Sequence, residues 1–266
     1  MDVNAKVGTM NRKKILITGS SGLVGSIIRT GIEDKYDVIG LDKMDHLNTD
    51  HIANSAHLND IYSYFDGVDT VIDLASNPDQ FSSWDEIYKN NLLCTYNCLE
   101  AALSAGVKRV IFASSNHATG MYEFDEPYRS IVSGDYDENV VNNIPLITTE
   151  MPIRPDGPYG IGKAFGEAAG RYFSDQHNIS VFCLRIGTVN KENRPVNIRQ
   201  YATLLSHEDL VRLVKSCIEA PIAKRFGIYY GVSNNKWRFW DLSNSHSELG
   251  YSPKDNAELW RTSESI

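Results

Sequence analysis

The sequence predicts an α/β protein built on a doubly wound parallel sheet. Segments typical of strands alternate with segments typical of helices through the first two thirds of the chain, and the first strand runs into a glycine-rich turn. This alternation favours parallel strands joined by helical crossovers, with ligands bound at the carboxyl ends of the strands. At 266 residues, the chain has the length of one domain with a small appended lobe.

Five apolar runs bounded by turn residues predict the strands of this sheet. They are Lys14–Thr18, Tyr36–Leu41, Thr70–Leu74, Lys108–Ala113 and Ile179–Arg185. Stretches with apolar residues at helical spacing lie between them and predict helices at Gly22–Ile32, Leu58–Phe65, Trp84–Ala105 and Tyr159–His177. Gly106 is a typical residue for ending the third helix.

The last part of the chain has a different pattern. After a loop that reaches Leu205, we expect a helix from His207 to Glu219, because Ser206 and Asp209 have the spacing of a capping box. A further segment typical of a strand follows at 227–230. These elements predict a small C-terminal lobe that binds substrate.

A long polar insertion at 122–155 interrupts the alternation. It contains Pro127, Pro145, Pro152 and Pro155, which argue against a regular helix. We therefore expect a loop or a small lobe that folds over the pocket.

A single domain is expected over residues 13–266, preceded by a flexible tail at 1–12. Its cofactor-binding part comprises about 13–121 and 156–187, and its substrate lobe about 122–155 and 188–266.

Composition excludes several classes of function. The net charge of −8 and the pI near 5.4 give no basic surface for nucleic acid. No apolar run has the ~18 residues that a membrane span needs, so we expect a soluble, cytoplasmic protein. The four cysteines have no spacing typical of metal ligands and are expected to be buried as small apolar residues: Cys94, Cys98, Cys183 and Cys217.

The turn at Thr18–Gly25 has the pattern of a dinucleotide-binding site of the Rossmann type. Its glycines allow a tight turn, a close approach of the backbone to a pyrophosphate, and a helix whose N-terminus faces the phosphates. Asp42 ends the second strand, where a carboxylate accepts hydrogen bonds from the adenosine ribose. That carboxylate would repel a 2′-phosphate, so NAD is favoured over NADP, although Lys43 lies beside it. A glycine-rich turn without a ligand is the alternative.

Two further patterns point to catalysis. Tyr159 and Lys163 are one helical turn apart on the same face, and a nearby cation favours the ionised form of a phenol. Such a pair also arises by chance, as a packed tyrosine and a solvated lysine. The segment Ser114–His117 supports a catalytic role for this pair, because it directly follows a predicted central strand and offers a serine hydroxyl to orient a substrate oxygen.

These motifs occur in the order found in extended short-chain dehydrogenases/reductases, and the sequence resembles that family over almost its whole length. The matching positions are Thr18–Gly25, Asp42, Asp73–Ser76, Asn91, Ser115, Tyr159 and Lys163. On this basis we expect NAD to contact Gly19, Ser21, Gly22, Leu23, Val24, Gly25, Asp42, Lys43, Leu74, Ala75, Ser76, Asn91, Ser114, Tyr159, Lys163 and Ile186.

A narrower resemblance is to uronate dehydrogenases and to haloarchaeal NAD-dependent glucose-6-phosphate dehydrogenases. It lies in Phe112–His117, Arg154–Gly157, Arg185–Gly187, Ser206–Asp209 and Pro253–Glu258. These relatives oxidise C1 of a pyranose to a lactone. The resemblance implies that Ser115, Asn116 and His117 touch the sugar, that Thr188 replaces a serine that contacts substrate, and that Arg199 meets an anionic substrate group.

The expected function is therefore NAD-dependent oxidation of C1 of a cyclic anionic aldose, either a hexuronate or a hexose 6-phosphate. Tyr159 acts as the base, Lys163 supports its ionised form and binds the nicotinamide ribose, and Ser115 orients the reacting oxygen. A metal is not expected. By the family resemblance, helices Trp84–Ala105 and Tyr159–His177 imply a homodimer or a larger homo-oligomer.

Two other functions stay open. A nucleotide-sugar epimerase or dehydratase would need room for a bulky nucleotide, yet only a short segment follows Lys163. A non-catalytic NAD-sensing protein is the second alternative, and such relatives typically lack the Tyr–Lys pair.

Overall fold

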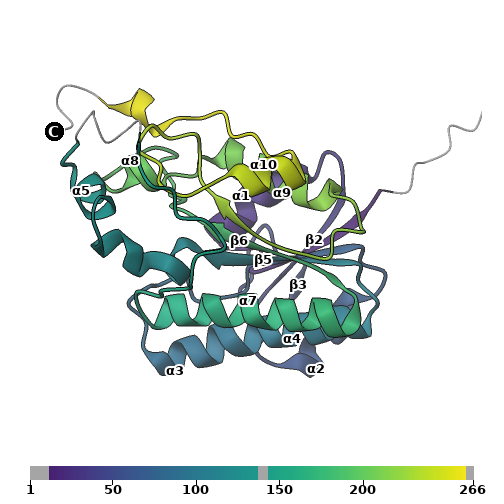
Figure 1. Ribbon diagram of the computed structural model, residues 1–266. Coiled ribbons are helices and arrows are strands. Elements are labelled where there is room, and N and C mark those ends of the chain that lie inside the picture. Colours follow the sequence, from purple (N-terminus) through teal and green to yellow (C-terminus); the bar gives the residue numbers. More distant parts are fainter. Residues whose placement is uncertain (1–11, 137–142, 262–266) are drawn as a thin grey trace, which may run out of the picture.

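The computed structural model describes residues 12–136 and 143–261, and it contains a seven-stranded sheet between two layers of helices (Figure 1). All strand pairs are parallel, in the order β3-β2-β1-β4-β5-β6-β7. The strands are β1 (Lys14–Thr18), β2 (Asp37–Asp42), β3 (His51–Ile52), β4 (Thr70–Asp73), β5 (Arg109–Ser115), β6 (Ser180–Ile186) and β7 (Phe226–Gly231). The expected doubly wound sheet is confirmed, and its order reverses between β1 and β4, where such sheets bind ligands. Most of the expected tail at 1–12 lies outside the described residues.

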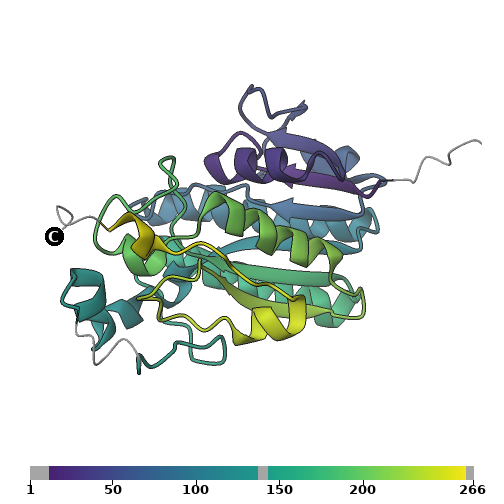
Figure 2. The same ribbon diagram turned by 90° about the horizontal axis from the view of Figure 1, so that it is seen from above.

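Helices cover both faces of the sheet. One layer contains α2 (Leu58–Ile61), α3 (Trp84–Ile87), α4 (Leu93–Ser104) and α7 (Pro158–His177). The other contains α1 (Leu23–Ile32), α9 (His207–Glu219) and α10 (Ser243–Leu249), which lie over the sheet in the view from above (Figure 2). Within the described part of the chain, no helix combines the length and apolar character needed to cross a membrane.

The alternation of side chains along the strands divides the core between these layers. Ile15 and Ile17 of β1 are fully buried beneath α1 and α9, where Leu213 joins them. Leu16 points to the opposite face and packs in the cluster that contains Phe173 of α7. This two-residue period matches the pleat of a strand that is buried on both faces. All four cysteines are free and buried, as expected.

The insertion at 122–155, expected as a loop or small lobe without regular helix, contains one; its residues 137–142 lie outside the described part of the chain. A 3₁₀ segment η3 (Asn116–Phe124) leads into a regular helix, α5 (Tyr128–Ser133). Pro127 occupies the N-cap position of α5, so it marks the start of the helix instead of preventing one. Gly134 ends the helix in the left-handed region, at φ 86°.

Other boundaries also differ from those expected. The segment expected as one helix from Trp84 contains a π-helical turn, η2 (Tyr88–Leu92), between α3 and α4. A 3₁₀ turn, η1 (Tyr62–Phe65), follows α2. Another, η4 (Ala257–Trp260), lies near the C-terminus, and a four-residue helix, α8 (Gln200–Thr203), lies within the expected loop before Leu205. Ser206 caps α9 as predicted, because its Oγ accepts from the Asp209 backbone N–H at 3.1 Å.

Candidate active site

A cavity of about 1270 Å³ opens at the carboxyl ends of β1, β4, β5 and β6. Gly19, Leu74, Ser115 and Gly187, which follow or end these four strands, all line it. Every residue assigned above to the cofactor or the sugar lines this cavity except Asn91. The structure thus brings the two groups of expected site residues together in one space.

The glycine-rich turn forms the wall of the cavity beside β1. Gly19 has φ +70°, and a Cβ at this position would lie 2.8 Å from the Leu74 carbonyl carbon. Its backbone N–H donates to the Leu41 carbonyl oxygen at 2.9 Å. Gly22 is the N-cap residue of α1, so the N-terminus of this ten-residue helix faces the cavity. This geometry fits the close approach of a pyrophosphate.

Asp42 lies across the turn at the end of β2. Its Oδ2 accepts from the backbone N–H of Ser21 at 2.9 Å and from the Ser21 hydroxyl at 2.8 Å, and its Oδ1 accepts from Met44 N at 3.1 Å. Lys43 and Asn54 line the same end of the cavity. A carboxylate held at this position is suited to accept hydrogen bonds from ribose hydroxyls.

The loop after β4 is held from two sides. Thr18 Oγ1 donates to Asp73 Oδ1 at 2.7 Å and accepts from the backbone N–H of Ala75 at 3.3 Å. Burial raises the pKa of Asp73 to about 6. Asn91 was expected to contact the cofactor, but its amide bonds both the N–H and the C=O of Asn77, at 2.9 and 3.1 Å. It therefore lies behind the loop, where it fixes the shape of the cavity wall.

Tyr159 and Lys163 project from the first turns of α7. This helix comes close to η3 because residue 160 is glycine: a Cβ there would lie 2.2 Å from the His117 carbonyl oxygen. Lys163 Nζ donates to the Ala113 carbonyl oxygen at 2.8 Å and to Ser76 Oγ at 3.2 Å, and it lies 5.4 Å from the centroid of the Tyr159 ring. The ammonium is thus fixed beside the phenol.

Ser115, Asn116 and His117 follow from the end of β5 into η3. Ser115 Oγ accepts from the His117 backbone N–H at 3.2 Å. In one orientation of the Asn116 amide, both its nitrogen and its oxygen have hydrogen-bond partners. The nitrogen then lies 3.3 Å from Ser115 Oγ and 3.1 Å from the Ile186 carbonyl oxygen. Because Ser115 accepts both bonds, its own hydroxyl proton is available to a ligand. The His117 ring packs edge-on to Tyr159, and its Nδ1 lies 2.6 Å from Asp156 Oδ2.

Arg199 lines the cavity as expected, but it already has a carboxylate partner. Its Nε and Nη2 donate to the two oxygens of Glu123 at 2.6 and 2.7 Å. Arg199 Nη1 donates to Thr188 Oγ1 at 3.4 Å. Glu123 was not among the residues expected here, because it lies in the insertion that showed no regular pattern. Arg199 therefore has a carboxylate partner from the protein itself at the position where the resemblance implies an anionic substrate group.

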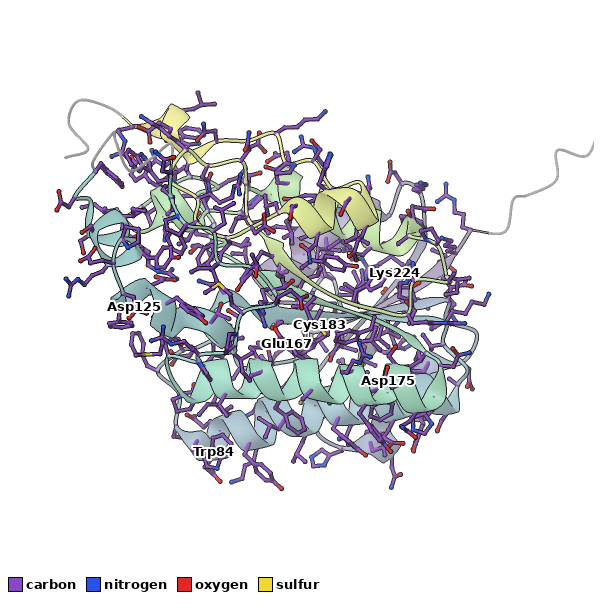
Figure 3. All side chains as sticks on the ribbon, viewed as in Figure 1. Trp84, Asp125, Glu167, Asp175, Cys183 and Lys224 are labelled. Carbon is purple, nitrogen blue, oxygen red and sulfur yellow. The ribbon has the colours of Figure 1, made fainter. Side chains whose placement is uncertain are left out.

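A buried ion pair supports the site from behind. The two oxygens of Glu167 in α7 accept from Nε and Nη2 of Arg185 in β6, both at 2.8 Å, and Glu167 Oε1 also accepts from the Ser114 hydroxyl at 2.6 Å. Figure 3 shows Glu167 on the side of α7 that faces the sheet, near Cys183. Arg185 Nη1 donates to the Tyr230 hydroxyl at 3.1 Å. Residues from α7, β5, β6 and β7 are therefore tied together directly beneath Ser115.

The sheet topology, the glycine turn and the polar groups at the strand ends define a dinucleotide-binding α/β enzyme. Residues 15–196 match the NAD dependent epimerase/dehydratase family. The chain belongs to this family, which confirms the expected enzyme class and the expected NAD cofactor.

Several known proteins are similar over nearly the whole chain. An NAD-dependent glucose-6-phosphate dehydrogenase of Haloferax volcanii is 35% identical, over 91% of this chain and 94% of its own. An L-arabinose 1-dehydrogenase (NAD(P)(+)) of the same organism is 30% identical, over 92% and 97%. The structure of a uronate dehydrogenase variant from Agrobacterium tumefaciens complexed with NAD is 28% identical, with a TM-score of 0.78 and coverage of 94% and 87%.

Proposed function

We propose that this protein oxidises C1 of a cyclic aldose to the lactone with NAD as the oxidant. The observation that carries the proposal is the single cavity in which the glycine turn of β1 meets Tyr159, Lys163 and Ser115. Bound NAD would supply the hydride acceptor that this oxidation needs. Gly19, Asp42 and the N-terminus of α1 would hold the cofactor.

The side chains divide the remaining work. Tyr159 takes the proton of the C1 hydroxyl as the hydride departs. Lys163 places its positive charge beside the Tyr159 ring and would bind the nicotinamide ribose. Its hydrogen bonds to the Ala113 carbonyl oxygen and the Ser76 hydroxyl hold it there. Ser115 donates its free hydroxyl proton to the reacting oxygen and so orients it. Together these residues accept a proton and position the substrate, which is the role of a general base with its supporting groups.

The names of the relatives support a sugar substrate, and the sugars that they name are anionic in some relatives and neutral in another. Uronates and glucose 6-phosphate are anionic, whereas L-arabinose is neutral. A hexuronate or hexose 6-phosphate, the anionic class, would have to displace Glu123 to take the two-pronged position on Arg199. The neutral class leaves their ion pair intact.

A panel of free aldoses, hexuronates and hexose 6-phosphates tests the proposal. We expect at least one member to reduce NAD, measured as the appearance of NADH, and to yield the corresponding lactone. A nucleotide-sugar panel serves as the comparison. Turnover of a nucleotide sugar alone would indicate an epimerase or dehydratase, and binding of NAD without turnover of any sugar would indicate an NAD sensor.

The position of Asp42 leads to a prediction about cofactor choice. A carboxylate that binds ribose hydroxyls repels a 2′-phosphate, so the protein should use NAD in preference to NADP. Asp42→Ser should lower the ratio of kcat/KM for NAD to that for NADP by about tenfold or more, since like charges in contact cost several kcal/mol. Asp45→Ser is a matched control, because Asp45 is exposed in the same loop but does not line the cavity. Equal use of NAD and NADP by the unaltered protein would contradict this role of Asp42.

We also propose that the protein forms a homodimer through the outer faces of α3, α4 and α7, which lie side by side on one face of the molecule (Figure 1). These helices and the turn η2 expose large side chains that are 41% to 52% exposed, namely Trp84, Tyr88, Tyr96, Ile161 and Tyr172. Large apolar side chains, most of them aromatic, that are exposed together on one face favour a protein interface there.

A further inference from the structure

We propose that Glu123 makes the sugar site selective for neutral aldoses, because its carboxylate occupies the position at which an anionic substituent would meet Arg199. The inference rests on the proposed function and names its substrate class: a cyclic aldose that carries hydroxyl or hydroxymethyl groups, and neither carboxylate nor phosphate, at the end opposite C1.

The geometry of the Glu123–Arg199 pair is that of a filled anion site. Both carboxylate oxygens accept from the guanidinium, at 2.6 and 2.7 Å, in the two-pronged arrangement with which arginine binds carboxylate or phosphate ligands. The Glu123 side chain is 10% exposed and that of Arg199 is 31% exposed. The hydrogen bonds and the charge of Glu123 raise the pKa of Arg199 above its ordinary value, against the lowering effect of burial. The protein thus supplies its own anion to this arginine.

The other basic side chains of the sugar half also have carboxylate partners. We define the sugar half as the cavity lining contributed by residues 115–133, 156–159 and 186–200. His117 faces Asp156 at 2.6 Å, and Arg129 lies 2.6 Å from Glu126. Among the described residues that line this half, Arg129 and Arg199 are the arginine or lysine side chains. Each has a carboxylate partner, and so does the ring of His117.

An anionic sugar would therefore meet more negative charge than free positive charge. To take the two-pronged position on Arg199 it must displace Glu123, which leaves a largely buried carboxylate without its partner. Loss of one partner from a charge pair that is mostly withdrawn from water is unfavourable. A neutral sugar meets no such penalty. Each Glu123 oxygen has a second lone pair for a sugar hydroxyl, and the Thr188 hydroxyl beside Arg199 supplies a further polar contact.

Matched sugars and matched variants test this inference. The sugars are D-glucose, D-glucuronate and D-glucose 6-phosphate, together with L-arabinose, D-galactose and D-galacturonate, each assayed for kcat/KM with NAD. Glu123→Gln keeps the shape of the side chain and removes its charge, so Arg199 becomes free to bind an anion. The control is Asp125→Asn, which removes a negative charge two residues away, at a side chain that pairs with Arg154 and does not line the cavity.

The unaltered protein should prefer the neutral member of each series. Glu123→Gln should raise the ratio of kcat/KM for anionic to neutral sugars by about tenfold or more, since removal of a repelling charge reverses a large penalty, and Asp125→Asn should leave this ratio within about twofold because an exposed pair contributes little. The double variant Glu123→Gln/Arg199→Gln should lack the gain, because no cation is then released.

Three results would overturn the inference. Preference of the unaltered protein for anionic sugars, or an unchanged ratio in Glu123→Gln, would show that Glu123 does not set the substrate class, while turnover of any sugar would leave the proposed function standing. Failure of every sugar to reduce NAD would instead remove the proposed function, and the inference with it.

Discussion

Replacement of Tyr159 by phenylalanine is expected to lower kcat by at least the ~10²–10⁴-fold that a positioned general base contributes. The change removes only the phenolic oxygen and keeps the ring that packs edge-on against His117 at 5.6 Å. Lys163 keeps its bonds to Ala113 and Ser76, so the cofactor end of the cavity is unaltered. The dissociation constant for NAD, measured by fluorescence or calorimetry, should therefore change little.

Tyr62→Phe is the control, because it removes the same oxygen from a tyrosine of η1 that does not line the cavity and lies outside the proposed dimer face. It should leave kcat and KM unchanged. Retention of more than about a tenth of the activity in Tyr159→Phe would show that another group accepts the proton, since loss of a positioned base costs far more. Weakened NAD binding at normal kcat would assign Tyr159 to the cofactor alone.

The parallel sheet could be predicted from the sequence because its strands are buried on both faces. Such strands appear as short apolar runs, for example Lys14–Thr18, and six of the predicted runs, including 227–230 for β7, lie within two residues of the observed ends. The two-residue strand β3 has no such run. It pairs with Leu41 and Asp42 of β2, so its formation depends on a neighbouring strand and not on a local pattern. Helix α5 is not predicted by its sequence, because a proline argues against a helix interior, whereas Pro127 lies at the N-cap and begins this helix.

The sequence predicts which residues line the cavity better than it predicts which charged side chains pair with one another there. Motifs at strand ends and helix starts place Gly19, Asp42, Ser115 and Tyr159 in the cavity, since parallel strands bring their carboxyl ends to one edge. The partner of Arg199 had no such signal. Glu123 is 76 positions away in the sequence, and only the packing of η3 against the loop before α8 brings the two charges together.

The support beneath the site depends on a pair of the same kind. Glu167 and Arg185 have side chains only 5% and 1% exposed, so two full charges are withdrawn from water and stabilise one another. From Arg185 a chain of hydrogen bonds runs through the hydroxyls of Tyr230 and Thr119 to the Asn116 carbonyl oxygen, in which each group donates to the next. Loss of one charge should therefore affect both the stability of the fold and the position of the residues that follow Ser115.

Arg185→Met should lower the free energy of unfolding by about 3–5 kcal/mol, because it leaves the buried Glu167 carboxylate without a partner. Glu167→Gln/Arg185→Met, which removes both charges, should recover most of this loss, since a buried ion pair is often no more stable than neutral side chains of similar size. Urea denaturation of the single and double variants measures both effects. The double variant should still show a reduced kcat at nearly normal stability. Its changes alter the hydrogen bonds to Tyr230 and Ser114, and these bonds hold the neighbouring Ser115 and Asn116 in position. A loss below about 1 kcal/mol in Arg185→Met, the size expected for an exposed pair, would mean that water or a shift of α7 relieves the charge of Glu167 and that this pair does not hold the site in place.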